Sequence, residues 1–285
     1  MAGASMKDIK NRIKSVESTM QITKAMELVA SSKLRKARER VERSRPYFNT
    51  MHQALADIAY SNTDFASPFV TPRAVKKTCY VVIAGDRGLA GGYNSNLFKA
   101  VAAHMEEKPV CVLPIGKKAV EYCERRGYEI LTKEFAVAEE VSISDCFVIA
   151  KRLSNGFEQG QFDELYVGYT NFVSMLSQNP AVLKVLPIYY DRTQAKDNGP
   201  QSLIIYEPSS EAVYDAIVPE YISGLVYGAL CESWASELGA RRTAMDAASK
   251  NAGEMIEDLN LKYNRARQGA ITQEITEIVA GAEQG

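Results

Sequence analysis

The sequence predicts an α/β fold in which a long antiparallel coiled coil of N- and C-terminal helices carries an inserted, Rossmann-like α/β domain. Two observations predict it: both ends of the chain repeat apolar residues at heptad spacing, and the segment between them alternates strand-like with helix-like runs. The chain has 285 residues, of which 46% are hydrophobic, so it is long enough for two ordinary domains. We divide it into an N-terminal helix over 1–62, a central domain over 75–206 and a C-terminal helix over 209–285.

The N-terminal helix is predicted by the absence of glycine between Ser5 and Tyr60 and by apolar residues at alternating steps of 3 and 4. Polar residues interrupt this seam near its middle, at Thr23 and Glu27. One helix of this length is longer than a compact domain of this mass is wide, so it needs an equally long partner. The seam comprises Met6, Ile9, Ile13, Val16, Met20, Thr23, Glu27, Ala30, Leu34, Ala37, Val41, Ser44, Phe48, Met51, Leu55 and Ile58.

The partner is predicted at the other end of the chain, where a helix-like stretch runs from about Pro219 to Ala282. Because proline fits the first turn of a helix, we expect a short helix from Ser210 to break or kink at Pro219. The same spacing then follows in two phases, the second one step out of register, which predicts a stutter. The first phase is Met245, Ala248, Ala252, Met255 and Leu259, and the second is Tyr263, Ala266 and Ala270.

The middle of the chain, from about Lys77 to Ile205, predicts a small α/β domain with a largely parallel sheet, because its strand-like runs are apolar throughout and alternate with helices. The predicted strands are TCYVVIAG, VCVLPIG, ELYVGYTNFVS and AVLKVLPIYY. The predicted helices cover Asn94 to Glu106, Lys117 to Gly127 and the run ISDCFVIAKRLSNGF.

One stretch of this domain, GDRGLAGGYNSN (Gly85–Asn96), has the form of a phosphate-binding loop, because glycines stand between a strand and a helix start. Its glycine spacing does not match the dinucleotide-binding signature, and the second strand ends in Gly116 where a ribose-binding carboxylate is expected. The P-loop signature is also missing. Asp86 and Arg87 could serve as a charge pair at a site, but a salt bridge that pins the turn is the commoner explanation, and we adopt it. The sequence therefore predicts no catalytic site and no cofactor.

The five cysteines are widely spaced and the histidines number two, so the sequence predicts buried thiols and no metal site. Neither a signal peptide nor a membrane span is expected, because no run approaches ~20 apolar residues. Although the net charge is only −1, basic residues gather between Lys7 and Arg45. They form either a solvated helix face or a surface for an acidic partner, which is a protein or a nucleic acid.

The two ends of the chain closely resemble the gamma subunit of F-type ATP synthase. The resemblance lies in MKDIKNRIKSVESTMQITKAMELVASSKLRKA at the N-terminus and ARQGAITQEITEIVAGA at the C-terminus, and GDRGLAGGYNSN is similar to that family's loop after its first central strand. It implies a rotor whose paired helices pass through a ring of three alpha and three beta subunits. Rotation of the c ring is then coupled to conformational change at three catalytic beta sites, for ATP synthesis or hydrolysis.

The resemblance also implies which residues contact partners. Arg267, Gln268 and Thr272 match family positions at the catch loops of the beta subunits, and Arg241 matches one that meets an acidic beta residue. Met26 matches the residue near the acidic lever segment of beta, although plain packing within the coiled coil explains a methionine there equally well.

At the foot, Tyr206 and Glu207 match positions that face the c ring, where the epsilon subunit also binds. The implied protein is a subunit without a catalytic site of its own, with no nucleic-acid partner. It meets the membrane only through its partners, on the cytoplasmic face of a bacterial cell membrane. The glycine loop is expected to fix the central domain against the shaft or a stator neighbour.

Overall fold

The computed structural model describes residues 6–61, 65–105, 109–189 and 206–282, and it packs as two compact units. The sheet unit comprises residues 32–240, and the coiled-coil unit comprises residues 1–31 and 241–285. Two long helices, α1 (Met6–Ser61) and α5 (Ser210–Ala282), contribute to both units. The polar stretch Asp191–Ser202, which the sequence places after the last strand, lies outside the described residues. None of the described helices has a stretch long and apolar enough to cross a membrane.

The sheet unit is built on a five-stranded sheet with the order β3-β2-β1-β4-β5. The pairs β1–β2, β1–β4 and β2–β3 are parallel, and β5 pairs antiparallel with β4. The predicted α/β class with a largely parallel sheet is therefore confirmed. The strands are β1 (Thr78–Ile83), β2 (Val110–Ile115), β3 (Glu129–Ile130), β4 (Glu164–Phe172) and β5 (Gln178–Leu186).

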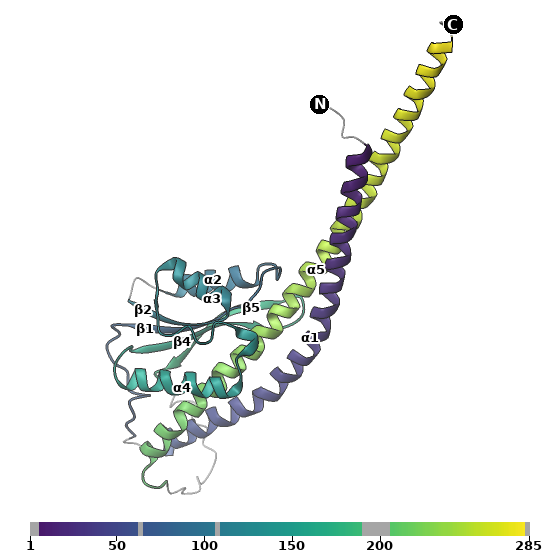
Figure 1. The fold of residues 1–285 in the computed structure, drawn as a ribbon. Coiled ribbons are helices and arrows are strands. Elements are labelled where there is room, and N and C mark those ends of the chain that lie inside the picture. Colours follow the sequence, from purple (N-terminus) through teal and green to yellow (C-terminus); the bar gives the residue numbers. More distant parts are fainter. Residues whose placement is uncertain (1–5, 62–64, 106–108, 190–205, 283–285) are drawn as a thin grey trace. The chain divides into compact units, whose positions relative to one another are not determined.

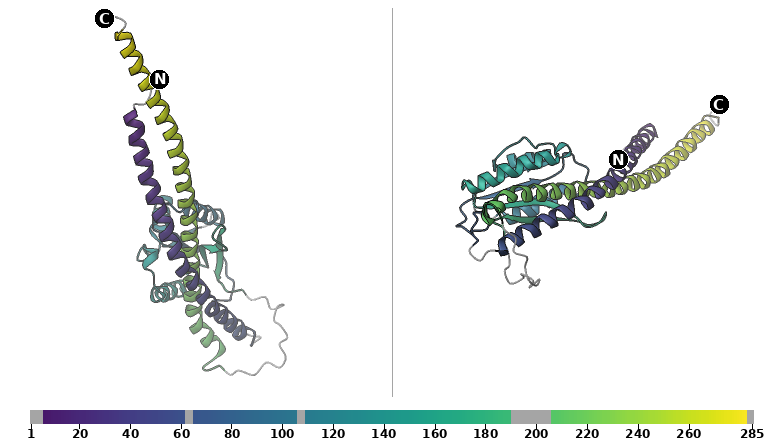
Figure 2. Two further views of the ribbon diagram at one scale, coloured as in Figure 1. Left: turned by 90° about the vertical axis from the view of Figure 1, so that its right-hand side faces the viewer. Right: turned by 90° about the horizontal axis from the view of Figure 1, so that it is seen from below.

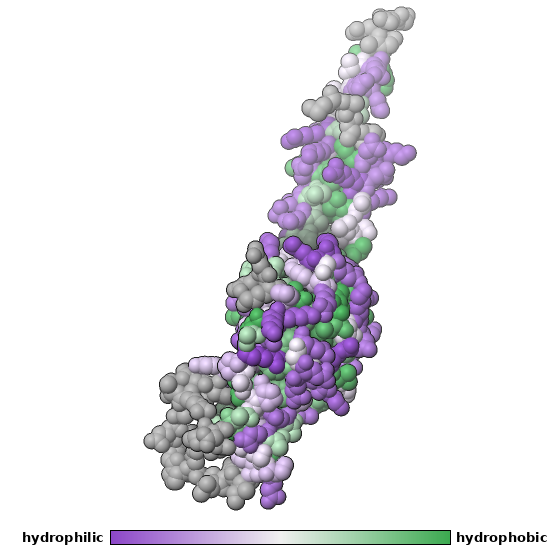
Figure 3. Space-filling model, turned by 90° about the vertical axis from the view of Figure 1, so that its left-hand side faces the viewer, coloured by the Kyte–Doolittle hydropathy of each residue, from purple (hydrophilic) through white to green (hydrophobic). Residues whose placement is uncertain are grey.

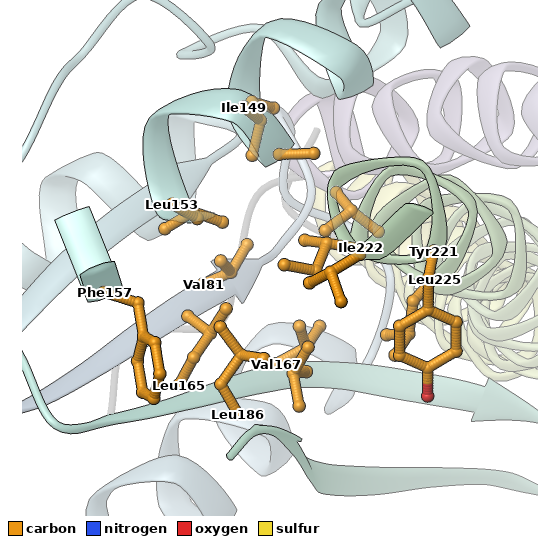
Figure 4. Close-up of a cluster of buried hydrophobic side chains, with 14 of the residues drawn as sticks. Val81, Ile149, Leu153, Phe157, Leu165, Val167, Leu186, Tyr221, Ile222 and Leu225 are labelled. Atoms are coloured by element: carbon orange, nitrogen blue, oxygen red, sulfur yellow. The ribbon is translucent and has the colours of Figure 1, made fainter. Parts of the chain in front are cut away.

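Helices cover both faces of the sheet (Figure 1). On one face, α2 (Tyr93–His104) and α3 (Lys117–Arg126) bury a core with alternate residues of β1 and β2. On the other face, α4 (Ile143–Glu158) and parts of α5 and α1 enclose the larger core. Figure 4 shows this core, in which Leu153 of α4 and Ile222 of α5 approach Val81 and Val167 of the sheet. Strands buried on both faces explain why their sequences are continuously apolar.

The ends of two helices follow from local sequence. α4 begins with a capping box, in which the hydroxyl of Ser142 accepts the N–H of Asp145 and the carboxylate of Asp145 accepts the N–H of Ser142. α3 ends at Gly127, whose φ of 71° lies in the left-handed region that glycine adopts readily. A short 3₁₀ turn, η1 (Ala138–Glu140), precedes α4.

α5 runs through Pro219 as one helix, so of the predicted break or kink, the break is wrong. A proline inside a helix removes one backbone hydrogen bond and costs about 3 kcal/mol. Around it, Tyr214, Val218 and Ile222 are fully buried in the larger core. Burial of three such side chains contributes more than the proline costs, at about 1.5–3 kcal/mol each. Tertiary packing therefore outweighs local propensity here.

The coiled-coil unit pairs α1 and α5 antiparallel, because α1 begins beside the carboxyl-terminal part of α5 (Figures 1 and 2). The predicted α1 seam is correct: in this unit its members from Ile9 to Ala30 are buried or half-buried, and only Met6 is exposed, at 37%. The last turns of α5 extend past the described start of α1 (Figure 2).

The seam of α5 differs from the predicted one. Ser249 and Ile256 are half-buried, whereas Met255 is 45% exposed. Substituting Ser249 and Ile256 for Ala248 and Met255 gives steps of 4 and 3 without interruption, so the expected stutter is wrong. The observed seam is Met245, Ser249, Ala252, Ile256, Leu259, Tyr263, Ala266 and Ala270. An unbroken heptad repeat is the pattern of a left-handed coiled coil.

The polar break in the seam is a hydrogen bond of 2.7 Å between the hydroxyls of Thr23 and Ser249. We expect Thr23→Val combined with Ser249→Ala to leave the coiled-coil unit as stable as before or to stabilise it by about 1 kcal/mol. Replacing both partners by apolar groups leaves no polar atom unsatisfied. Hydrogen exchange of the amides between Met245 and Leu259 measures the change. Faster exchange in the double variant than in the unchanged chain contradicts the expectation.

Candidate functional site

The glycine loop is held by a carboxylate of its own. The side chain of Asp86 accepts the backbone N–H groups of Lys117 at 3.0 Å, Ala138 at 2.9 Å and Glu139 at 3.1 Å. The first of these groups belongs to the N-terminal turn of α3, which attracts anions. Asp86 therefore occupies a place where a bound phosphate would be stabilised. The interpretation of Asp86 as one half of a salt bridge with Arg87 is replaced by these three hydrogen bonds.

The loop is closed on itself by Asn94, whose side-chain oxygen accepts the N–H of Gly85 at 3.0 Å. The following helix, predicted to begin at Asn94, begins one residue earlier, since α2 starts at Tyr93. Asn94 therefore stabilises the loop instead of capping the helix.

A second ligand position of such sheets lies between β1 and β4, where the strand order reverses. The last pair that joins these strands is Val82 with Gly168, so the backbone of Thr170 lies beyond the end of β1. α5 supplies its partners: the N–H of Thr170 donates to the hydroxyl of Ser233, and the hydroxyl of Ser236 donates to the carbonyl of Thr170, both at 3.1 Å. Both serines are buried. Helix α5 therefore fills the crevice.

Glu237 lies against the start of the glycine loop. A Cβ atom added to Gly85 would stand 2.7 Å from a carboxylate oxygen of Glu237, so a larger residue here would displace the Glu237 side chain. Glu237 as a whole residue is only 9% exposed. Sequence reasoning missed Ser233, Ser236 and Glu237, because a buried polar residue on a helix carries no signal that names a backbone partner elsewhere in the chain.

Two thiols of the sheet unit, Cys123 and Cys146, are unsuited to nucleophilic chemistry at neutral pH. All five cysteines are buried, as predicted. Burial raises the pKa of Cys123 to about 12, and burial together with the nearby Cys231 raises the pKa of Cys146 to about 12. The thiol form of these two cysteines therefore persists in the folded chain well above pH 7.

These pKa shifts predict a loss of stability at alkaline pH. The unfolded chain releases the thiol protons of Cys123 and Cys146 from about pH 9 upward, whereas the folded chain keeps them until about pH 12. The contribution of these two thiols to the free energy of unfolding is therefore fully present below about pH 9. Above that pH it falls by up to about 1.4 kcal/mol per pH unit for each thiol. Fluorescence of the single tryptophan, Trp234, during urea unfolding measures this fall. Replacing both cysteines by alanine should flatten it, and an unchanged slope refutes the assignment.

The predicted contacts at the end of the coiled-coil unit lie together on α5. Arg267, Gln268 and Thr272 are exposed, and the hydroxyl of Thr272 donates to the carbonyl of Gln268 at 2.9 Å. Arg241 and Met26 are half-buried. Between Arg241 and Arg267 the helix rises about 39 Å, so the structure does not bring these two arginines into one site.

The other two predicted contact residues belong to the sheet unit and immediately precede α5. Tyr206 is half-buried and packs against the larger core, and Glu207 is exposed. The two residues therefore lie in one segment with different exposure.

Two groups of exposed apolar side chains lie in the coiled-coil unit. On α1 they include Ile22, which is 58% exposed, with Leu28 and Val29. On α5 they are Ile271, Ile275, Ile278 and Val279, of which Ile278 is 71% exposed. Figure 3 shows hydrophobic residues between hydrophilic ones along these helices. Apolar groups of this kind mark surfaces that another protein covers.

The chain matches a family model described as ATP synthase over residues 5–284. It is 48% identical over 285 residues to the ATP synthase gamma chain of Alkaliphilus metalliredigens, with 99% of each chain covered. The chain belongs to the ATP synthase gamma-chain family. Within this family it is also 43% identical over 295 residues to the sodium-ion-specific gamma chain of Acetobacterium woodii, with 98% of each covered. The resemblance seen in the sequence is confirmed.

Two solved structures that are similar to this gamma-chain family member come from mitochondrial ATP synthases. A chain from the central stalk and c-ring structure of Tetrahymena thermophila matches with a TM-score of 0.60 and 26% identity, over 80% of this chain and 99% of that one. A chain from the Euglena gracilis complex matches with a TM-score of 0.67 and 18% identity, over 98% and 94%. The second similarity concerns the fold alone.

Proposed function

We propose that the chain is the central rotor shaft of an F-type ATP synthase, which couples ion-driven rotation of the c ring to conformational changes at the three catalytic beta-subunit sites. The observation that carries the proposal is the exposed apolar group on the last turns of α5, from Ile271 to Val279, in a member of the gamma-chain family. Such a group in a two-helix unit needs an apolar sleeve, which the ring of alpha and beta subunits supplies.

The asymmetry of the coiled-coil unit supports this function. One helix extends beyond the other, so the shaft offers a different surface to each of three identical neighbours (Figure 2). To shift a site from 1:99 to 99:1 in favour of one conformation takes about 5.5 kcal/mol of differential contact energy. Several packing and charged contacts must therefore change at each step.

We assign the beta contacts to Met26, Arg241, Arg267, Gln268 and Thr272. The exposure of the last three on adjoining turns of α5 supports the assignment. The exposed basic residues of α1, among them Arg35, Lys36 and Arg38, suit acidic surfaces of the same partners.

We assign the c-ring contacts to Tyr206 and Glu207, with the epsilon subunit bound nearby. Tyr206 is anchored in the larger core, which gives the exposed Glu207 a rigid support. The chain would act as a peripheral subunit on the cytoplasmic face of a bacterial membrane, attached through these partners.

We further propose that the chain carries no catalytic site of its own. Asp86 fills the anion position at the start of α3, and α5 fills the crevice between β1 and β4. These contacts disfavour the alternative of a nucleotide-using enzyme, because both positions at which an α/β sheet holds a nucleotide are taken by the chain itself.

Reconstitution tests the proposal. The purified chain is mixed with alpha and beta subunits, and the expected product is a stable complex that hydrolyses ATP. Titration calorimetry on the chain alone is the matched control, with no specific ATP binding expected. Failure to form the hydrolysing complex overturns the rotor function, and tight ATP binding by the isolated chain overturns the absence of a site.

A further inference from the structure

We infer that Ser233, Ser236 and Glu237 of α5 are positioning residues that make the sheet and the glycine loop turn with α5 under load. We call these three side chains the α5 latch. The inference rests on the proposed rotor function and assigns a role in it to residues that contact neither nucleotide nor partner. Ser236 and Glu237 follow Ser233 by three and four residues, so the three side chains lie on one face of the helix.

The latch holds the backbone of β4 at a point that β1 does not reach. β1 ends at Ile83, and its pairing with β4 ends at Gly168. The two serines then bind the N–H and the carbonyl of the same residue, Thr170, inside the protein. Without them both backbone groups would be buried and unsatisfied. Helix α5 thereby supplies the hydrogen-bond partners that β1 does not supply.

The third member extends the latch to the glycine loop. The carboxylate of Glu237 fills the space that a side chain at Gly85 would need. The next residue, Asp86, is bound to α3 and to η1 through three backbone N–H groups. A displacement of α5 against the sheet therefore disturbs two strands, one helix start and the loop together.

Directional contacts explain why packing alone is insufficient. The larger core joins α5 to the sheet over many apolar side chains, but apolar contact has no preferred direction and tolerates small rotations. Hydrogen bonds lose strength when their geometry changes. The latch therefore fixes the rotational register of α5 on the sheet, which torque would otherwise displace.

The test uses Ser233→Ala with Ser236→Ala in the assembled, membrane-bound complex. Hydrogen exchange of the Thr170 amide should rise about tenfold, because its buried partner is lost. ATP-driven membrane potential per ATP hydrolysed, read in inverted vesicles with a voltage-sensitive dye, should fall by on the order of twofold. Hydrolysis without load and the amount of assembled chain should stay unchanged. The dye reports H⁺ and Na⁺ transport alike.

Ser223→Ala is the matched control, since Ser223 is a buried serine on the same helix and its hydroxyl makes no hydrogen bond among the described residues. It should change neither readout. If the double variant fails to assemble, Glu237→Gln decides by the potential per ATP and by exchange of the loop amides. An unchanged potential per ATP in a variant with faster exchange overturns the inference. A wild-type complex that builds no potential instead overturns the proposed function.

Discussion

Gly116→Ala is expected to destabilise the sheet unit by at least about 4 kcal/mol. Gly116 has a φ of 96°, which side chains rarely adopt, and its added Cβ would stand 2.1 Å from the carbonyl oxygen of Ala84. Ala84 is buried directly after β1, and its own N–H donates to the carbonyl of Ile115. Neither the backbone of Gly116 nor that of Ala84 can move away without separating the central strands of the sheet. Urea unfolding followed by Trp234 fluorescence measures the loss.

Gly127→Ala provides the control for Gly116→Ala. Gly127 has a similar φ of 71°, but nothing lies within 4 Å of an added Cβ. Only the conformational term remains, which costs about 1–2 kcal/mol. Equal losses in the two variants contradict the steric argument, since they would leave nothing to the contact with Ala84.

Met26→Lys is expected to lower the membrane potential generated per ATP several-fold while the complex still assembles. Met26 is half-buried beside the seam of the coiled coil, and a lysine stem can lie along that surface with its ammonium group in water. The helix pair should therefore survive. An added charge at the proposed contact with beta would change which sites the shaft favours. The assay is the voltage-sensitive dye in inverted vesicles.

Met255→Lys is the control for this substitution, because Met255 is a methionine of the same unit that is 45% exposed and has no proposed contact with a partner subunit. It should leave coupling intact. Equal uncoupling by both lysines shows that charge anywhere on the shaft is harmful and removes the specific role of Met26. Unchanged potential per ATP in Met26→Lys defeats the prediction outright.

Periodic features could be predicted from the sequence, and long-range polar contacts could not. The α1 seam follows from a repeat that any helix pair must bury, so positions such as Leu34 and Val41 are buried as expected. On α5 the repeat is ambiguous between Ala248 and Ser249, since alanine suits either environment. The prediction took Ala248 and Met255 in place of Ser249 and Ile256, which produced the false stutter.

The candidate site was harder to predict because its partners are backbone groups. Asp86 binds the N–H of Lys117 and Glu139, and Ser233 binds that of Thr170, across loops whose closure no local pattern reveals. A backbone N–H is offered by nearly every residue, so side-chain identity does not indicate the pairing. The predicted break at Pro219 was wrong for a related reason, because the packing that overrides the local preference of proline comes from distant residues.

The shared core of α1 and α5 sets the order in which the chain can fold. Leu55 and Ile58 pack in the same core as Tyr214 and Leu230, which the ribosome delivers much later. Contacts so distant in sequence slow folding, because a long loop must close before they form. Until the last quarter of the chain has emerged, the sheet lacks its final cover and Thr170 lacks its bonds. The nascent chain therefore has to remain soluble with an open apolar face through most of its synthesis.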